Sequence, residues 1–130
     1  MPMYDEKYEL EDDTAFTTDA YSTTEVNFGV TNPNVGRAGK FGMHVVVTTL
    51  FAGAASGIIF WVMHGAATAP TTKSVGRFMP VADLVAGFHF YVPGPHTLLQ
   101  YCRAWYDLVS EAATAGKVTV WLGPNEDGAL

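Results

Sequence analysis

The sequence predicts an all-β protein, a jelly-roll-like antiparallel β-sandwich that follows an extended acidic N-terminal arm. Three observations support this fold class. Apolar and polar residues alternate with a period of two in several short runs, which is typical of half-buried strands. Turn-forming residues separate these runs, and 130 residues is the length of a single domain. We expect an arm at residues 1–19, a sandwich at 20–122 and a tail at 123–130.

The N-terminal arm is defined by its charge, because the first 19 residues hold seven of the 13 acidic side chains and only one base. A charged run of this kind is commonly a solvated tail, and the alternative is that it docks on a neighbouring protein subunit. We expect the arm to act as a tether that lies on a neighbouring subunit. The arm residues predicted to lie in a protein interface are Tyr4, Asp5, Glu6, Tyr8, Glu9, Glu11, Asp12 and Asp13.

Residues 41–72 contain no Lys, Arg, Asp or Glu, and the stretch 45–63 within them is long enough for a transmembrane helix. Strands are favoured instead, because β-branched residues are frequent there and a cluster of small residues at 51–57 suits a turn. No group of basic residues flanks the stretch to orient it in a membrane. We expect two strands, 41–51 and 57–64, paired as a hairpin.

The remaining strands are predicted from alternation. One short run lies at 26–30, one helical turn is expected near 81–85, and further strands are expected at 88–92, 101–109 and 117–122. In the 101–109 strand, Cys102, Ala104, Tyr106 and Leu108 share one face, and Tyr101, Arg103, Trp105 and Asp107 share the other. By the same parity the core wall is predicted to combine Phe60 and Val62, or their alternates Ile59 and Trp61, with Phe88, Phe90, Val118 and Val120.

Composition narrows the function classes. Acidic residues outnumber basic ones 13 to 7, and the seven bases are scattered, so direct nucleic-acid binding is not expected. Charged residues make up only 15% of the chain, which indicates that some apolar surface meets a partner. A single cysteine, Cys102, excludes an intrachain disulfide and fits a reducing cytoplasm. The acidic N-terminus does not have the pattern of a secretion signal.

The sequence offers no catalytic constellation and no cofactor site. It contains neither a phosphate-binding glycine loop nor a nucleophile elbow, and Cys102 lies mid-strand among apolar neighbours, as a buried thiol would. In the expected hairpin His44 and His64 would lie opposite each other and could bind a transition metal. We favour the alternative that the two histidines are only polar groups at the end of the hairpin, because no third metal ligand lies at a usable sequence spacing. We therefore expect no enzyme, no metal and no cofactor.

The aromatic residues allow two interpretations. Tyr101, Trp105, Trp121, Trp61 and Tyr91 could form a stacking platform for sugars, as in carbohydrate-binding or host-attachment modules. At alternate strand positions, aromatic residues are more often core or interface residues. Both faces of the 41–64 region are apolar, so we expect another subunit to cover one of them. Trp61, Tyr91 and His96 are accordingly predicted as interface residues, in addition to the acidic arm.

Short motifs along most of the chain carry a family resemblance. They are the Thr-rich stretch 17–24, the Gly-rich stretch 36–42 before a long β run, the segment 80–87 with its Asp-Leu-Val-Ala-Gly end, 101–106, and the Thr-Ala-Gly turn within 113–116. This order of elements resembles the small capsid cement proteins of tailed phages, of the kind first seen in Bordetella phage. The acidic N-terminus and the tail at 124–128 depart from that pattern.

The resemblance implies a jelly roll that assembles as a homotrimer on the outer surface of the icosahedral head. There such a protein clamps neighbouring major capsid proteins after the head expands, and it carries no catalytic residues or cofactor. The implied partners are therefore the major capsid protein and further copies of the chain, with neither nucleic acid nor membrane. The implied location is the virion, assembled in the host cytoplasm. A carbohydrate-binding module and a single-span membrane protein remain the alternatives.

Overall fold

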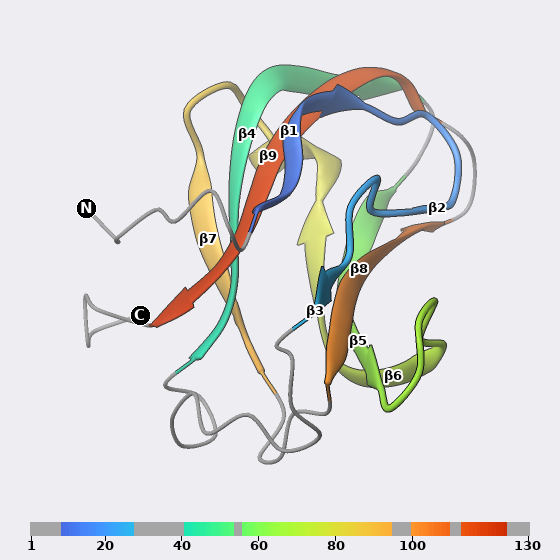
Figure 1. Cartoon of the computed structure of the whole chain (residues 1–130). Coiled ribbons are helices and arrows are strands. Elements are labelled where there is room, and N and C mark those ends of the chain that lie inside the picture. Colours follow the sequence, from blue (N-terminus) through green and yellow to red (C-terminus); the bar gives the residue numbers. More distant parts are fainter. Residues whose placement is uncertain (1–8, 28–40, 54–55, 95–99, 110–112, 125–130) are drawn as a thin grey trace.

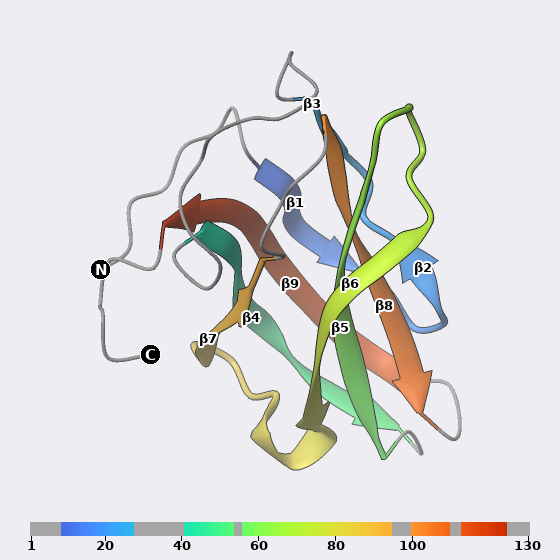
Figure 2. The same cartoon turned by 90° about the horizontal axis from the view of Figure 1, so that it is seen from below.

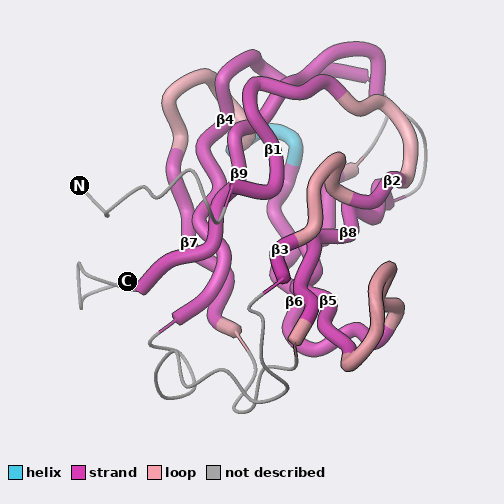
Figure 3. The backbone as a smooth tube through the Cα atoms, in the orientation of Figure 1, coloured by secondary structure: helices cyan, strands magenta, loops and turns pink. Residues whose placement is uncertain are grey.

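The structure of the protein is a computed structural model that describes residues 9–27, 41–53, 56–94, 100–109 and 113–124. Within these ranges the chain forms nine strands and one short 3-10 helix, arranged as two facing layers (Figures 1 and 3). The elements are β1 (Glu9–Ala15), β2 (Ala20–Tyr21), β3 (Val26–Asn27), β4 (Phe41–Gly53), β5 (Gly57–Gly65), β6 (Thr72–Pro80), η2 (Val81–Asp83), β7 (His89–Pro93), β8 (Tyr101–Val109) and β9 (Ala113–Pro124).

The strands are divided between two antiparallel sheets, which Figure 2 shows as separate layers. Sheet A has the order β1-β9-β4-β7, and sheet B has the order β2-β8-β5-β6, with β3 also paired to β8. The pairing is nested: β5 pairs with β6, β4 with β7, β2 and β3 with β8, and β1 with β9. A long antiparallel ribbon rolled up in this way is a jelly roll. The predicted all-β sandwich is confirmed.

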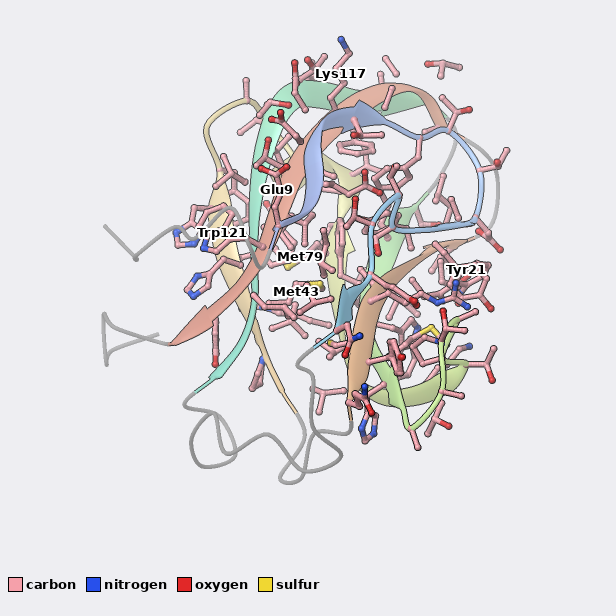
Figure 4. All side chains as sticks on the ribbon, viewed as in Figure 1. Glu9, Tyr21, Met43, Met79, Lys117 and Trp121 are labelled. Atoms are coloured by element: carbon pink, nitrogen blue, oxygen red, sulfur yellow. The ribbon has the colours of Figure 1, made fainter. Side chains whose placement is uncertain are left out.

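The core lies between the sheets and follows the predicted parity. Met43 of sheet A and Met79 of sheet B point into the space between the layers (Figure 4). In β8 every second side chain is buried, and these are the predicted Cys102, Ala104, Tyr106 and Leu108. The predicted core wall is also present, with Phe60, Val62, Phe90, Val118 and Val120 buried and Phe88 packed at its margin. The 3-10 helix η2 lies within the expected helical turn at 81–85.

The hairpin expected between 41–51 and 57–64 is wrong. β4 belongs to sheet A and β5 to sheet B, so the chain crosses from one layer to the other between them. Both backbone edges of β4 are already occupied, because β7 pairs along one and β9 along the other. The apolar residues 45–63 are thus divided between two strands, and none of the helices that the structure describes is long and apolar enough to span a membrane.

The boundary expected between an arm at 1–19 and the sandwich is also wrong from residue 9 onward. Residues Glu9–Ala15 form β1, an edge strand of sheet A that pairs with β9. Leu10 is fully buried and anchors this strand in the core, which compensates for the charge of its neighbours. At the other end β9 continues to Pro124, so the expected tail begins later than residue 123. Residues 1–8 and 125–130 lie outside the described ranges.

Candidate protein-interaction surface

The outer face of sheet B carries a row of large aromatic side chains. Strand register places Trp61 of β5 beside Trp105 of β8, and Trp105 beside Tyr21 of β2. The Tyr21 and Trp105 rings touch, with centroids 4.4 Å apart. We define the aromatic face as the outward side chains that are half-buried or exposed on this sheet: Tyr21, Ile59, Trp61, Phe78, Tyr101 and Trp105.

Two cations lie over these rings. The Arg103 guanidinium lies 3.5 Å from the centroid of the Tyr21 ring, and its Nε donates a hydrogen bond to the Pro70 carbonyl. The Lys73 ammonium lies 5.2 Å from the Trp61 ring. A cation over an aromatic face contributes about 0.5–1 kcal/mol at an exposed site, and more when the pair is desolvated. The face therefore combines Trp, Tyr and Arg, the residue types enriched at the energetic centres of protein interfaces.

The Trp61 ring is held in place by its cross-strand neighbour, Gly76 of β6. A Cβ added at Gly76 would lie 2.6 Å from the indole, so only glycine allows the ring to lie against that strand. Exposed Phe78 follows two residues later on the same side of β6. The sequence of β6 is therefore what shapes one margin of the aromatic face.

The outer face of sheet A is different, because its aromatic side chains are buried. His44 lies in register between Tyr91 of β7 and Trp121 of β9, and all three are at most 5% exposed. Figure 4 shows Trp121 on the side of the molecule opposite Tyr21. Burial raises the pKa of the Tyr91 hydroxyl to about 12. This face offers less accessible aromatic surface than sheet B.

His44 and His89 form a paired unit on sheet A. Nδ1 of His44 is 3.2 Å from Nε2 of His89, while the ring centroids are 5.4 Å apart and the planes differ by 18°. The rings therefore lie edge to edge, joined by an N–H···N hydrogen bond, and the Trp121 indole is nearly parallel to both. Such a bond needs one N–H and one lone pair, so the intact pair carries at most one positive charge.

The structure does not bring His44 and His64 together as a metal-binding pair, because they lie in different sheets. Burial lowers the pKa of His64, which disfavours its charged form. Among the residues that the structure describes, no group of three or more His, Cys, Asp or Glu side chains could hold a metal ion.

The N-terminal acids divide into a buried group and an exposed group. Glu11 is only 3% exposed, and its carboxylate accepts hydrogen bonds from the Thr23 amide and hydroxyl at 2.7 and 2.8 Å. Asp13 has a left-handed backbone (φ 47°), and its carboxylate accepts a bond from the Thr48 hydroxyl. Asp12 is exposed beside half-buried Glu9. Burial, and then the Asp12 charge, raise the pKa of the Glu9 carboxyl.

The predicted interface residues lie in different environments. Glu11 and Tyr91 are buried within the chain, so their side chains offer little surface to a partner, and their place in an interface stays a prediction. Glu9, Asp12 and Asp13 lie on an edge strand of their own sandwich, where the backbone ladder to β9 and buried Leu10 hold them, and not on a free arm. Trp61 lies on the aromatic face as part of an accessible surface. Tyr4, Asp5, Glu6, Tyr8 and His96 are outside the described residues.

The five aromatic residues that could have formed a sugar platform, the less favoured interpretation, do not lie on one surface. Trp61, Trp105 and Tyr101 share the outer face of sheet B, while Tyr91 and Trp121 lie on sheet A. The sequence pattern did not identify Tyr21, Lys73 and Phe78 as members of the aromatic face. Tyr21 stands in a two-residue strand and Lys73 and Phe78 in a strand with weak alternation, so no sequence period marked them. The alternation of β8 did identify Tyr101, Arg103 and Trp105 as one face.

The buried titratable groups have the properties of structural residues. Burial raises the pKa of the Cys102 thiol to about 12, so the reactive thiolate is scarce at neutral pH. The pKa of Tyr106 is raised well above its usual range by burial and also by the charge of Glu11. Tyr106 stacks on Phe16 with ring centroids 4.2 Å apart, within the core.

Comparison with known families adds one finding. A family model described as Bbp16 matches residues 10–122 of the chain. The match extends from the second residue of β1 into β9 and so includes strands of both sheets. A search of curated proteins finds no match.

Proposed function

The chain belongs to the Bbp16 family, a family of Bordetella phage proteins, and from this premise we propose that it is a non-enzymatic structural protein of a phage virion. In this proposal the protein binds the outer surface of the icosahedral head as a homotrimer. There it cements neighbouring major capsid proteins against the pressure of the packaged DNA. Its partners are protein surfaces, with neither nucleic acid nor a membrane among them.

The observation that carries this proposal is the aromatic face of sheet B. Tyr21 and Phe78 are 40% and 47% exposed, and Trp61, Trp105 and Tyr101 beside them are half-buried. A contiguous exposed apolar surface on a small domain usually marks a contact site. Its content of Trp, Tyr and Arg matches the composition of protein–protein interfaces. A rigid jelly roll that presents such a face is suited to bridging other subunits.

The mechanism would be additive and physical. Packaged DNA pushes neighbouring capsid subunits apart, and a cement that spans two subunits adds buried interface to each seam. Protein interfaces of standard size bury about 1,600 Å² in total, and many copies act in parallel on one head. A few kcal/mol for each copy would therefore raise the cost of opening the shell substantially.

Sedimentation with purified expanded heads tests the proposal. The protein is expected to pellet with the heads and to saturate at a fixed ratio to the major capsid protein. The variant Trp105→Ala should weaken this binding, whereas Val85→Ala, at an exposed apolar position outside the aromatic face, should not. A folded protein that never pellets with heads at any concentration would rule out the cement function.

A carbohydrate-binding module is the second candidate, because Trp61, Tyr101 and Trp105, three of the five residues considered for a sugar platform, share the aromatic face. The cations weaken it, since Arg103 lies on the Tyr21 ring and Lys73 lies over the Trp61 ring, where a sugar would otherwise stack. Quenching of Trp fluorescence by host-surface polysaccharide, without binding to heads, would favour this candidate over the cement.

A further inference from the structure

The turn between β5 and β6 lies over the outer face of sheet B. We call residues 66–71 the β5–β6 turn, and both views show it beside β8 on the side away from sheet A (Figures 1 and 2). Pro70 in this turn is buried, and a Cβ added at Gly65 would lie 3.0 Å from the Pro70 Cβ. Met63 shares the outward side of β5 with Trp61, yet it is only 2% exposed and does not belong to the core between the sheets. This end of the outer face is therefore covered.

Two side chains from neighbouring parts of sheet B hold the β5–β6 turn. Glu25 directly precedes β3, and its carboxylate accepts hydrogen bonds from the Thr68 hydroxyl and from the Ala69 amide, the latter at 2.8 Å. Nε of Arg103 in β8 donates to the Pro70 carbonyl at 2.9 Å. The register of β3 on β8 brings Glu25 next to Arg103. One carboxylate and one guanidinium thus bind three consecutive residues of the turn.

The β5–β6 turn depends on these contacts because Ala69 has a left-handed backbone, with φ 57°. Residues other than glycine rarely adopt this conformation, and it persists only where the surrounding structure maintains it. Glu25 accepts from the amide of Ala69 itself, so it acts at the strained residue. Without this carboxylate we expect Ala69 to relax and the Pro70 carbonyl to move away from Arg103.

Arg103 connects the β5–β6 turn to the aromatic face. Its guanidinium lies 3.5 Å from the centroid of the Tyr21 ring, and that ring touches Trp105 with centroids 4.4 Å apart. Tyr21 is 40% exposed, so burial alone does not fix its position. An unbroken series of contacts therefore runs from Glu25 through the turn to Arg103, Tyr21 and Trp105.

We infer that Glu25 is a positioning residue for the aromatic face. Through the β5–β6 turn it holds Arg103 on Tyr21, and it thereby fixes the Tyr21–Trp105 pair in the arrangement that a protein partner meets. A surface that is ordered before binding loses less conformational entropy on association and so binds more tightly. This inference rests on the proposed function, because the partner is the capsid surface named there.

Nuclear magnetic resonance of the isotope-labelled full-length chain tests the positioning without any partner. The Arg103 Nε–H signal of the wild type is expected upfield, because of the Tyr21 ring current, and in slow exchange with water, because it donates to Pro70. Glu25→Ala should speed this exchange by about tenfold and remove the shift, while the backbone amides of β5 and β8 stay protected. Glu25→Gln, which retains one acceptor oxygen, should preserve much of both properties.

Sedimentation with expanded heads tests the consequence for binding. Glu25→Ala should weaken binding by about tenfold and Glu25→Gln by about threefold or less. Asp83→Ala removes an exposed carboxylate in η2, outside these contacts, and should change neither binding nor the Arg103 signal. In a Tyr21→Ala background, Glu25→Ala should add less than about a twofold loss, because Glu25 acts through that ring. A general loss of stability would instead weaken binding equally in both backgrounds.

Three results would overturn the inference: an Arg103 signal that Glu25→Ala leaves unchanged, binding of this variant as tight as that of wild type, or equal losses in the two backgrounds. Thr68→Val removes one exposed donor to Glu25 and should produce smaller changes in the same direction, so it provides the test if Glu25→Ala does not fold. Failure of the proposed function looks different, since the wild type then never pellets with heads. In that case the response of the Arg103 signal still decides whether Glu25 positions the aromatic face.

Discussion

The phenyl rings of Phe60 in β5 and Phe90 in β7 meet edge to face across the sandwich, with centroids 5.0 Å apart and planes at 66°. Phe60 also packs against Tyr106 of β8 at 5.8 Å, so one ring joins three strands. Edge-to-face pairs add about 0.5–1.5 kcal/mol to the stabilisation from burial alone. This contact is central to the packing of sheet A on sheet B.

Replacing Phe90 by Ala should therefore destabilise the fold strongly. Removing a large buried aromatic side chain costs about 3–5 kcal/mol through lost burial and the cavity that remains. Urea denaturation measures the change in the free energy of unfolding. Phe78→Ala is the matched control, because Phe78 is 47% exposed and its loss should cost about 1 kcal/mol or less. Equal losses in the two variants would contradict the core described above.

Alanine substitutions at Gly116 and Gly87 distinguish the cost of a steric clash from the cost of backbone strain. Both have positive φ, 143° and 89°, so alanine is strained at either position. A Cβ at Gly116 would lie 2.2 Å from the Phe51 ring, whereas a Cβ at Gly87 meets nothing within 4 Å. We expect Gly87→Ala to cost about 1–3 kcal/mol of stability. Gly116→Ala should cost about 1–3 kcal/mol more than Gly87→Ala, because of the added clash. Thermal melting that ranks Gly87→Ala as the more damaging change would contradict the Gly116–Phe51 contact.

Glu11 should be a stabilising residue although it is charged and buried. Its carboxylate accepts from both the amide and the hydroxyl of Thr23 and so ties β1 to the segment between β2 and β3. Glu11→Ala leaves these donors without their acceptor and should cost about 1–3 kcal/mol. Asp83→Ala, at an exposed carboxylate, should change stability by about 0.5 kcal/mol or less. A difference of zero between the two variants in urea denaturation would show that Glu11 is not needed for this attachment.

Alkaline pH should reveal the burial of Cys102. Burial raises its pKa from 9.0 to about 12, so between these values the unfolded chain releases a proton that the folded chain retains. Stability is therefore fully present below pH 9 and falls as the pH rises toward 12, by about 1.4 kcal/mol per pH unit from this group. Tyr91, with its pKa raised to about 12 by burial, adds to the decline above pH 10.

The variant Cys102→Ala isolates the thiol's share of this decline. Below pH 9 it should be less stable than wild type by a constant amount, and between pH 9 and 11 this difference should shrink. Free energies of unfolding measured across that range provide the comparison. An unchanging difference from pH 8 to 11 would mean that the thiol ionises equally in the folded and unfolded states.

The side chains that share one face of a strand could be predicted from the sequence, because a strand places successive side chains on opposite faces. This rule located the buried side of β8 and the core positions Phe60, Phe90 and Val120. Which strands pair with each other in a sheet could not be predicted in the same way. β4 and β5 are apolar over much of both faces, so their sequences do not distinguish a hairpin within one sheet from a crossover between two.

The N-terminal strand was missed for a different reason. β1 has the sequence Glu-Leu-Glu-Asp-Asp-Thr-Ala, in which only Leu10 is a large apolar residue. A bulged register to β9 breaks the alternation further, and left-handed Asp13 lies within the irregular part. The charged residues of this segment led to the prediction of an arm. In the structure, backbone pairing with β9 and the buried Leu10 hold the segment as a strand. The aromatic face was partly predictable, since Tyr101, Arg103 and Trp105 alternate regularly in β8.

The most direct test of the proposed cement function is the temperature at which DNA-filled heads release their DNA. Heads depleted of this protein should release DNA at a lower temperature than native heads, and adding back the purified protein to saturation should restore the native value. The variant R103E/K73E, which changes the two cations over the rings of the aromatic face, should restore it poorly. K117E, at an exposed base on sheet A, should restore it fully. If depleted, native and restored heads all release DNA at the same temperature, the protein does not cement the shell.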